Sequence, residues 1–211
     1  LLFKALGYST EDLLNYFYRT EKIFVRGKRY FKSFQEDFLK GQRAGRDIKH
    51  PETGEVIVPK GRIFSKRSLR QLKTAEVETI PIDNEELLEK VFAQTIRDPE
   101  TGEPIVRSND LVTEEHLEAL NQAGVHQFEV LFVDRMTSGD SIRKTLQLDK
   151  VDNKEEALIE IYRRLRPGNP ATPEVAQDFI DHLFFRSSYY DLSGVGRMKI
   201  NLRLGVNTPI E

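Results

Sequence analysis

An internal repeat with a period of 48 residues constrains this chain more than any other feature of its sequence. Pro51-Glu52-Thr53-Gly54-Glu55 returns as Pro99-Glu100-Thr101-Gly102-Glu103, and the two copies then align without a gap. Apolar positions keep the same offset, since Ile57, Leu69, Leu72 and Val77 correspond to Ile105, Leu117, Leu120 and Val125. A match sustained at one offset is the signature of a duplicated supersecondary unit. We therefore expect two tandem units, at about 48–97 and 96–135, that cover each other's apolar faces.

Each copy predicts the same order of elements. The Pro-Glu-Thr-Gly segment forms a turn, because Gly54 and Gly102 can adopt positive φ without steric cost. A strand of β-branched residues follows, and then a helix capped by Ser65 in the first copy and by Thr113 in the second. A return strand closes each unit, at Val77–Ile82 or Phe128–Val133. The predicted module is a β-turn-strand-helix-strand unit that occurs twice.

The predicted helices of the two copies differ in charge. Three basic residues of the first copy occupy the positions of three acidic residues in the second: Lys66, Arg67 and Arg70 correspond to Glu114, Glu115 and Glu118. The simpler interpretation is that both helices present solvated faces that diverged neutrally. The alternative is that the first helix faces an anionic partner while the second faces solvent or a basic protein surface. The pattern favours the first interpretation and leaves the second open.

The segment before the repeat predicts a helix, a short strand and a second, weaker helix. Ser9 can cap a helix that has Asp12 at its third position, and this helix is expected to end near Thr20. Ile23–Gly27 predicts a short strand that ends in a glycine turn, and residues 34–39 predict a weakly patterned helix.

Beyond the repeat the pattern changes between Asp134 and Gly139, where we place a domain boundary. Ser141–Gln147 predicts a short helix, and Asn153 caps a longer one that Pro167-Gly168 ends. The apolar face of the longer helix comprises Ala157, Leu158, Ile161, Tyr162 and Leu165.

Two further helices are predicted towards the end of the sequence. Thr172 before Pro173 opens the first. Its buried residues are expected to be Val175, Ala176, Phe179, Ile180 and Leu183, with Phe184 and Phe185 completing that core. The last helix follows Tyr190-Asp191 and carries Leu192, Val195, Met198 and Leu202 on one side. Gly194 and Gly196 would each cost it up to about 1 kcal/mol relative to alanine, so they predict close approach by another backbone or a ligand.

Composition limits the class of protein. The 211 residues suffice for one large or two small domains, and 31% charged residues with a net charge of −2 leave any nucleic-acid contact to a local patch. The absence of cysteine excludes disulfides and thiolate metal sites and predicts a cytoplasmic protein. No apolar run approaches the roughly 20 residues of a membrane span. Because the sequence starts without methionine and within patterned sequence, we expect a fragment of a longer protein.

Two clusters of basic residues are candidates for phosphate contact. Arg163, Arg164 and Arg166 lie at the predicted end of one helix, where cations are also favoured by the helix dipole without any ligand. In the last helix Arg197 lies one turn from Asn201, and Lys199 lies one turn from Arg203. Spacing alone favours the structural interpretation of the first cluster and solvated faces for the second.

The sequence predicts neither catalytic nor metal-binding residues. Its histidines, which are His50, His116, His126 and His182, lack metal-ligand spacing with acidic neighbours. Adjacent carboxylates such as Glu85-Glu86 and Glu155-Glu156 are typical of helix starts and point in different directions. Gly194-x-Gly196 is too short for a phosphate-binding loop and is not followed by Lys-Ser or Lys-Thr.

Several motifs in the last third of the chain resemble the β subunit of bacterial DNA-directed RNA polymerase. They are Arg166-Pro167-Gly168, Leu183-Phe184-Phe185 and Tyr190-Asp191-Leu192-Ser193-Gly194-Val195-Gly196-Arg197-Met198-Lys199-Ile200-Asn201. Ala5-Leu6-Gly7-Tyr8-Ser9-Thr10-Glu11 resembles the family's segment just before its lobe insertion. The resemblance implies that residues 1–20 and 138–211 form a helical part of the lobe. Residues 21–137 would then be an inserted α+β module, which gives an α+β fold overall.

The resemblance also implies a supporting role in DNA-templated RNA synthesis. By similarity, the lobe borders downstream duplex DNA and the non-template strand, while the Mg²⁺-binding aspartates of the nucleotidyl-transfer centre lie in other parts of the enzyme. Arg166 stands at the family's Arg-Pro-Gly motif and is the first candidate for a nucleic-acid contact. The weaker candidates are Arg163, Arg197, Lys199 and Arg203. Tyr189 stands where the family often has arginine, which puts a charge contact there in doubt, although tyrosine can stack on a base.

The partners implied by the resemblance are DNA and the β′, α and σ subunits, in a bacterial cytoplasmic, nucleoid-associated enzyme without membrane contact. The alternative function is a protein-docking module, in which the repeat recruits a transcription factor or another subunit and the fragment touches no DNA.

Overall fold

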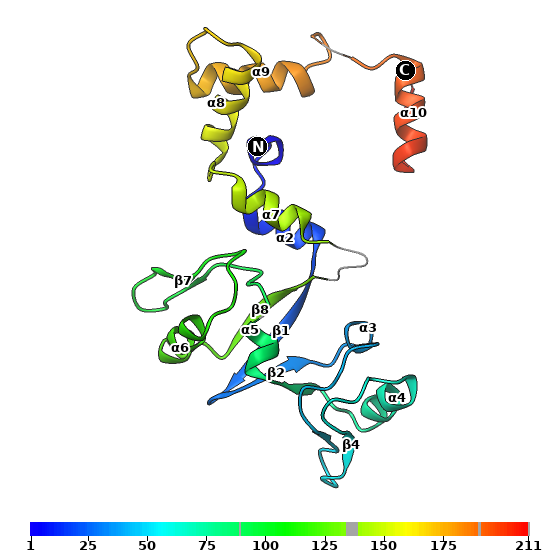
Figure 1. Ribbon diagram of the computed structural model, residues 1–211. Helices are drawn as coiled ribbons and strands as arrows, with labels where there is room; N and C mark the ends of the chain where they lie inside the picture. Colours follow the sequence, from blue (N-terminus) through cyan, green and yellow to red (C-terminus); the bar gives the residue numbers. More distant parts are fainter. Residues whose placement is uncertain (89, 134–138, 190, 211) are drawn as a thin grey trace. The chain divides into compact units, whose positions relative to one another are not determined.

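The computed structural model of the protein describes residues 1–88, 90–133, 139–189 and 191–210. Its helices and small antiparallel sheets confirm the predicted α+β class. The chain forms two compact units (Figure 1). We call Ser9–Lys150 the sheet unit, and Leu1–Tyr8 together with Val151–Glu211 the helical unit. Predictions for Asp134–Ser138 and for Tyr190, including the boundary placed after Asp134, lie outside the described residues.

A four-stranded antiparallel sheet organises the sheet unit. Its order is β5-β2-β1-β8, and its strands are β1 (Arg19–Arg26), β2 (Arg29–Ser33), β5 (Thr79–Ile82) and β8 (Gln127–Phe132). The strand predicted at Ile23–Gly27 is present but starts earlier, because burial alternates along the whole of β1. Helix α2 (Thr10–Phe17) correspondingly ends before Thr20. Gly27, at φ +62°, makes the turn between β1 and β2.

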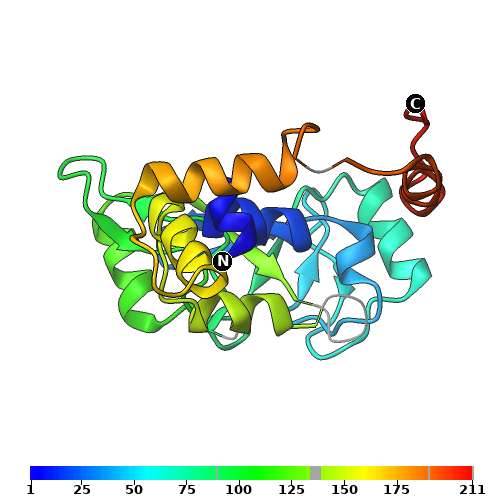
Figure 2. The same ribbon diagram turned by 90° about the horizontal axis from the view of Figure 1, so that it is seen from above.

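Two segments of the sheet unit each form a β-hairpin, a helix and a strand of the sheet. The first hairpin-helix segment contains β3 (Ile48–Lys49), β4 (Val56–Val58), α4 (Lys66–Thr74) and β5. The second contains β6 (Ile96–Arg97), β7 (Pro104–Val106), α6 (Glu114–Gln122) and β8. Each element of the second begins 48 residues after its counterpart. Figures 1 and 2 place α4 and α6 at opposite ends of the sheet unit.

Local hydrogen bonds in the two segments recur at the same offset. The Ala44 N–H donates to the Arg62 carbonyl in the first, and the Phe92 N–H donates to the Asp110 carbonyl in the second, both at 2.9 Å. The predicted helix caps are confirmed, since the hydroxyls of Ser65 and Thr113 accept backbone N–H groups at 3.1 and 3.2 Å. The predicted turn glycines, Gly54 and Gly102, adopt φ +71° and +72°.

The segments bury separate apolar clusters. The first cluster includes Leu39, Ile48, Val58, Phe64, Leu69, Leu72 and Ile80. The second joins the second segment to the sheet and includes Ile23, Tyr30, Phe92, Val106, Leu117, Leu120, Phe128 and Val130. The weak helix predicted at 34–39 is present as α3 (Glu36–Leu39), and a short helix, α5 (Asn84–Leu88), lies between the segments along the chain.

Two helices of the sheet unit, α2 and α7, contact each other where the chain enters and leaves the sheet. The predicted capping box of Ser9 and Asp12 starts α2, and the helix predicted at Ser141–Gln147 is present as α7 (Ser141–Leu148). The Tyr18 hydroxyl donates to the Gly139 carbonyl at 2.9 Å and accepts the Arg143 backbone N–H at 3.2 Å. The first residue of β1, Arg19, pairs with the last residue of β8, Phe132.

The helical unit consists of α1 (Leu2–Ala5), α8 (Lys154–Leu165), α9 (Pro173–Phe184) and α10 (Gly194–Leu204). The predicted caps Asn153 and Thr172 are confirmed. Its core comprises Ala5, Ala157, Leu158, Tyr162, Ala176 and Ile180.

Several predicted core residues of the helical unit are exposed instead. Phe184 and Phe185 are 52% and 68% exposed, and Val175 is 43% exposed. The buried residues of α9 are Ala176 and Ile180, and Val175 is turned about 100° away from Ala176. Phe184 stands one turn after Ile180 at the end of α9, and Phe185 is its C-cap, so both lie beyond the last buried residue of the helix. Burial along α8 likewise ends at Tyr162, so its last residue, Leu165, is exposed.

The two glycines of α10 have different neighbours. A Cβ added to Gly194 would lie 3.2 Å from the side-chain Cγ2 of Ile210 and 3.7 Å from its backbone oxygen, so the close neighbour is a side chain and not the predicted backbone or ligand. A Cβ added to Gly196 would meet Leu192 and the capping Ser193 of the same helix at 3.4 Å. The second glycine thus accommodates the helix's own N-terminus, which corrects the prediction of another backbone or a ligand at that position.

Candidate nucleic-acid interface

Arg166 is the exposed C-terminal cap of α8. Its backbone N–H donates to the Tyr162 carbonyl at 2.8 Å, which holds the residue against the last helical turn. Its guanidinium carbon lies 5.8 Å from the centre of the Phe179 ring on α9, within the range of a cation–π contact. Two helices therefore position this cation while leaving it accessible to a ligand.

The neighbouring arginines differ in their partners. Arg164 forms the ion pair predicted at four-residue spacing, with nitrogen to oxygen distances of 2.9 and 2.8 Å to Glu160. Arg163 is exposed, and no carboxylate of the described residues pairs with it. The end of α8 thus offers Arg163 and Arg166 to an anion, whereas the charge of Arg164 is largely neutralised.

Three candidate residues lie on α10. Lys199 and Arg203 are exposed, and Arg197 is half-buried. Ser193 caps the helix by accepting the Gly196 N–H at 3.2 Å, and Gly205 ends it at φ +65°. The candidate residues thus form two groups on separate elements, the end of α8 and the length of α10, and not one cluster.

Within the described part of the chain, none of the five candidate cations forms a salt bridge with an acidic side chain. Four of them are exposed, and Arg197 is half-buried. An arginine buried against an internal carboxylate could not bind phosphate, and that situation does not occur here. The geometry therefore permits contact with a phosphate backbone at both groups.

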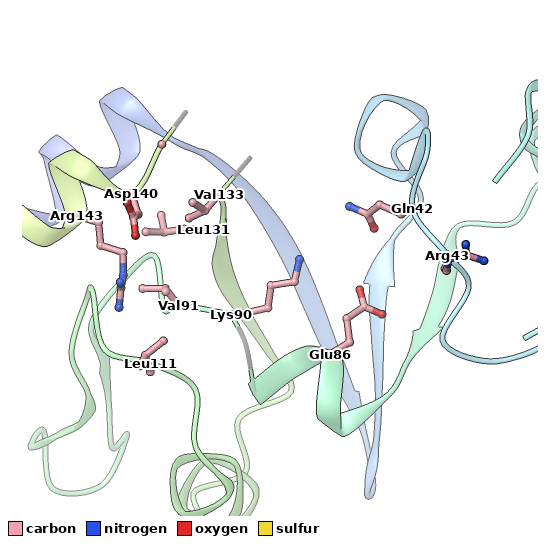
Figure 3. A pocket seen from close by; sticks show the side chains of 11 residues that line it. Gln42, Arg43, Glu86, Lys90, Val91, Leu111, Leu131, Val133, Asp140 and Arg143 are labelled. Carbon is pink, nitrogen blue, oxygen red and sulfur yellow. The ribbon is translucent and has the colours of Figure 1, made fainter. Parts of the chain in front are cut away.

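The sheet unit contains a pocket of about 800 Å³ with charged walls. Figure 3 shows Lys90 between Glu86 on one side and Asp140 with Arg143 on the other, while Arg43 points away. Its charges are of both signs, so the pocket shows no preference for an anion or a cation.

Two buried ion pairs lie beside this pocket. Lys90 Nζ is 2.9 Å from Glu21 Oε2, and Lys32 Nζ is 2.7 Å from Glu86 Oε1. The side chains of Glu21 and Lys32 are each only 2% exposed. Neither pair was predicted from the sequence, because the partners lie 69 and 54 positions apart in the chain.

The described residues contain no group of three or more His, Cys, Asp or Glu side chains that could hold a metal ion. Three histidines have local structural contacts, and His50 Nδ1 accepts the backbone N–H groups of Glu52 and Thr53. His116 Nδ1 lies 3.0 Å from the Leu111 carbonyl, and His182 Nδ1 lies 2.7 Å from the Asp178 carbonyl. Among the described helices, none is long and apolar enough to cross a membrane.

Comparisons with known proteins agree with the resemblance. The family model of RNA polymerase Rpb2, domain 2, matches residues 134–211. The chain is 56% identical over 210 residues to a protein of Desulfosudis oleivorans named DNA-directed RNA polymerase subunit beta. Proteins of the same name from Desulfatibacillum aliphaticivorans and Syntrophobacter fumaroxidans are 56% and 48% identical over 211 and 212 residues.

These three alignments cover 100% of this chain but only 15% or 16% of each relative. They include the residues of both hairpin-helix segments, so these relatives contain a counterpart of that region as well. The chain therefore belongs to the family of bacterial DNA-directed RNA polymerase β subunits, of whose length it spans about 15%.

Proposed function

We propose that this chain forms part of the β-subunit lobe and lines the DNA channel of a DNA-directed RNA polymerase. In this role it holds downstream duplex DNA and the non-template strand, while nucleotidyl transfer, with its Mg²⁺ ions, takes place in other parts of the enzyme. The observation that carries the proposal is the exposed Arg166 guanidinium, oriented over Phe179 within the segment that the family model matches.

Phosphate contact is the chemistry that this surface supports best. Arginine and lysine on helices bind phosphate oxygens and thereby position a nucleic acid without reading its sequence. Arg163 and Arg166 on α8, with Lys199 and Arg203 on α10, are the exposed cations of this kind. A wall of such contacts would guide a strand towards chemistry performed elsewhere.

The proposed organisation assigns residues 1–20 and 138–211 to the lobe and 21–137 to an insertion made of two tandem copies. The pairing of Arg19 with Phe132 supports it, because an inserted module needs its two ends close together. The common offset of 48 residues between corresponding elements supports the duplication. The β′, α and σ subunits are the proposed protein partners.

The test is to substitute Arg166→Gln and Arg197→Gln in the intact polymerase and to measure the lifetime of promoter complexes as a function of salt. We expect a lifetime several-fold shorter and a weaker salt dependence, since each phosphate contact to duplex DNA contributes about 0.9 to the log–log slope. Arg164→Gln is the matched control, because its guanidinium is already paired with Glu160. Unchanged lifetimes for the double variant would refute the proposal.

A second candidate function is protein docking by residues 21–137, which recruits a transcription factor or another subunit. The opposite charges of α4 and α6 favour it, since neither charge pattern is needed for the common fold. Deleting 21–137 from the intact polymerase separates the two functions. Loss of promoter-complex lifetime on deletion, but not in the arginine variant, would transfer the function to the insertion.

The proposal also assigns no catalysis to this region itself. The 211-residue chain alone should incorporate no nucleotide into RNA, and it should bind DNA weakly because it supplies only one wall of a channel. Nucleotide incorporation by the isolated chain, measured with a primed template, would contradict a purely supporting role.

A further inference from the structure

The two hairpin-helix segments have opposite charges on a common backbone. Residues 56–75 contain six basic residues and no acidic one. The corresponding residues 104–123 contain one basic and four acidic residues. Because β4 and α4 correspond to β7 and α6 at one offset, the fold itself does not require the positive charge of the first segment.

The positive charge lies along a groove. An open pocket of about 710 Å³ runs between the hairpin and α4 of the first segment. Val56, which is 40% exposed, and the half-buried Ile57 supply apolar surface, and Lys66, Arg67 and Arg70 supply cations. Glu55 is the one acidic residue among those that line it. The groove thus combines an apolar floor with a basic rim.

Within the described residues, the basic side chains of α4 form no salt bridge with an acidic side chain. The carboxylate of Asp83, an acid that follows the first segment, is occupied by Arg46 and Lys60. Lys66 and Arg67 lie in the first turn of α4, where positive charge opposes the helix dipole, whereas α6 has Glu114 and Glu115 there. The first segment therefore carries a locally unfavourable charge arrangement without an internal compensation, which is typical of a binding surface.

The turn of the hairpin gives a second indication. Asp98 Oδ1 accepts the backbone N–H groups of Glu100 and Thr101 at 2.7 and 3.2 Å. In the first segment His50 Nδ1 does the same for Glu52 and Thr53 at 3.2 and 3.3 Å. In the first segment a histidine therefore accepts the N–H groups of the turn, and the edge of this groove lacks the negative charge that Asp98 supplies in the second. The counterpart pocket of the second segment, about 350 Å³, is lined by Asp98 and Glu100 instead.

We propose that the groove between β4 and α4 binds an acidic segment of a partner protein. The partner's apolar side chains would pack on Val56 and Ile57. Its carboxylates would pair with Lys66, Arg67 and Arg70. A protein segment fits better than a nucleic acid. Single-stranded nucleic acids bind through base stacking on aromatic rings, and no Phe, Tyr or Trp is among the described residues that line this groove. The proposal is independent of the DNA contacts assigned to Arg166 and Arg197.

The experiment measures fluorescence anisotropy of a labelled peptide titrated with the 211-residue chain. In the peptide, pairs of Glu alternate with Leu and Phe; a second peptide has Gln in place of Glu. We expect the acidic peptide to bind and the Gln peptide to bind far more weakly. Arg67→Gln combined with Arg70→Gln should weaken binding about tenfold, since two exposed charge pairs are lost. Val56→Ser should weaken it several-fold, because part of the apolar floor is removed.

The matched control uses the equivalent positions of the second segment. Glu115→Gln combined with Glu118→Gln should leave binding unchanged, and far-UV circular dichroism should show that all variants fold. Binding that is insensitive to the arginine pair would overturn the proposal. The proposal would also be overturned if a thymidine oligonucleotide or polyglutamate bound as tightly as the acidic peptide and Val56→Ser had no effect on binding. The groove would then be a general surface for anions. These peptide-binding results do not depend on Arg166. A refutation of the acidic-segment proposal is therefore distinct from a refutation of the proposed lobe function.

Discussion

Two buried charged side chains distinguish the sheet from an ordinary apolar one. Glu21 of β1 and Lys32 of β2 face inward beside Ile23, each with a partner of opposite charge. Of their partners, Glu86 lies in α5 and Lys90 lies just after it, in the chain between the two hairpin-helix segments. Such pairs are costly to break because the remaining charge stays partly out of water. They therefore fix how that connecting chain lies against the sheet.

Glu21→Gln tests this at one residue. The change removes the charge that compensates Lys90, whose side chain is only 16% exposed, and we expect a loss of about 3 kcal/mol in the free energy of unfolding. The neighbouring Lys22→Gln is the control, because Lys22 is 59% exposed and 3.9 Å from Glu129, so its loss should stay below about 1 kcal/mol. Urea unfolding followed by circular dichroism measures both. Equal losses would show that the buried pair has no special weight.

A second residue-scale prediction concerns the equivalent turns. Gly54 and Gly102 have φ near +70°, and open space lies where a Cβ would be added. Alanine at either position should therefore cost about 1 kcal/mol through backbone strain alone, and asparagine should cost less because it tolerates this conformation. Thermal unfolding of the four variants tests whether stability falls in the order glycine, asparagine, alanine at each turn. A large difference between the two turns would contradict their structural equivalence.

At the scale of the element, the first hairpin-helix segment is tied to the chain that follows it by one carboxylate. The hydrogen bond from Arg46 holds the pKa of Asp83 below its ordinary value of 3.8, with the charge of Lys60 at 3.5 Å adding to it and partial burial opposing it. Arg46 and Lys60 precede and follow the hairpin of β3 and β4. Asp83 thus joins both ends of that hairpin to the start of α5.

The lowered pKa predicts a pH dependence of stability. A carboxyl group whose pKa is lower in the folded state stabilises the fold above its unfolded pKa, and this contribution is lost as pH falls through the folded pKa. The difference in unfolding free energy between the wild type and Asp83→Asn should therefore be constant near neutral pH and shrink below about pH 4. Urea unfolding across this range measures it. Arg46→Gln should reduce the same pH dependence, and a difference that persists unchanged at low pH would refute the assignment.

Elements defined by local chemistry were predictable from the sequence, and those defined by distant partners were not. Ser9, Ser65, Thr113, Asn153 and Thr172 were identified as caps because a cap needs only the next three residues. The ion pairs of Glu21 and Lys32 join residues 69 and 54 positions apart, which no local pattern encodes. Phe184 and Phe185 were misassigned to the core because hydrophobicity does not specify where along α9 the burial ends. Arg166 was found through a motif, but its contact with Phe179 required the structure.

For the molecule as a whole, the order of the sheet matters more than the repeat alone suggested. The repeat predicted two similar units that cover each other. In the sheet unit their return strands, β5 and β8, do not pair with each other, because the β1–β2 hairpin lies between them. β5 pairs with β2 and β8 pairs with β1, so each segment is completed by one strand from outside the repeat. This strand order could not be inferred from the period of the repeat.

The shared hairpin predicts how a core defect spreads through the sheet unit. Ile23 of β1 is fully buried in the cluster that joins the sheet to the second segment, and Leu72 of α4 is fully buried in the cluster of the first segment. Alanine at either position should lower the free energy of unfolding by about 2–5 kcal/mol.

The two variants should nevertheless differ in their patterns of amide hydrogen exchange, because regions of a fold open with different free energies. Ile23→Ala should lower amide protection in both β5 and β8, since the β1–β2 hairpin supports both strands. Leu72→Ala should lower it in β5 and much less in β8. Equal loss in β8 for the two variants would mean that the two segments open as a single block and that the hairpin does not separate them.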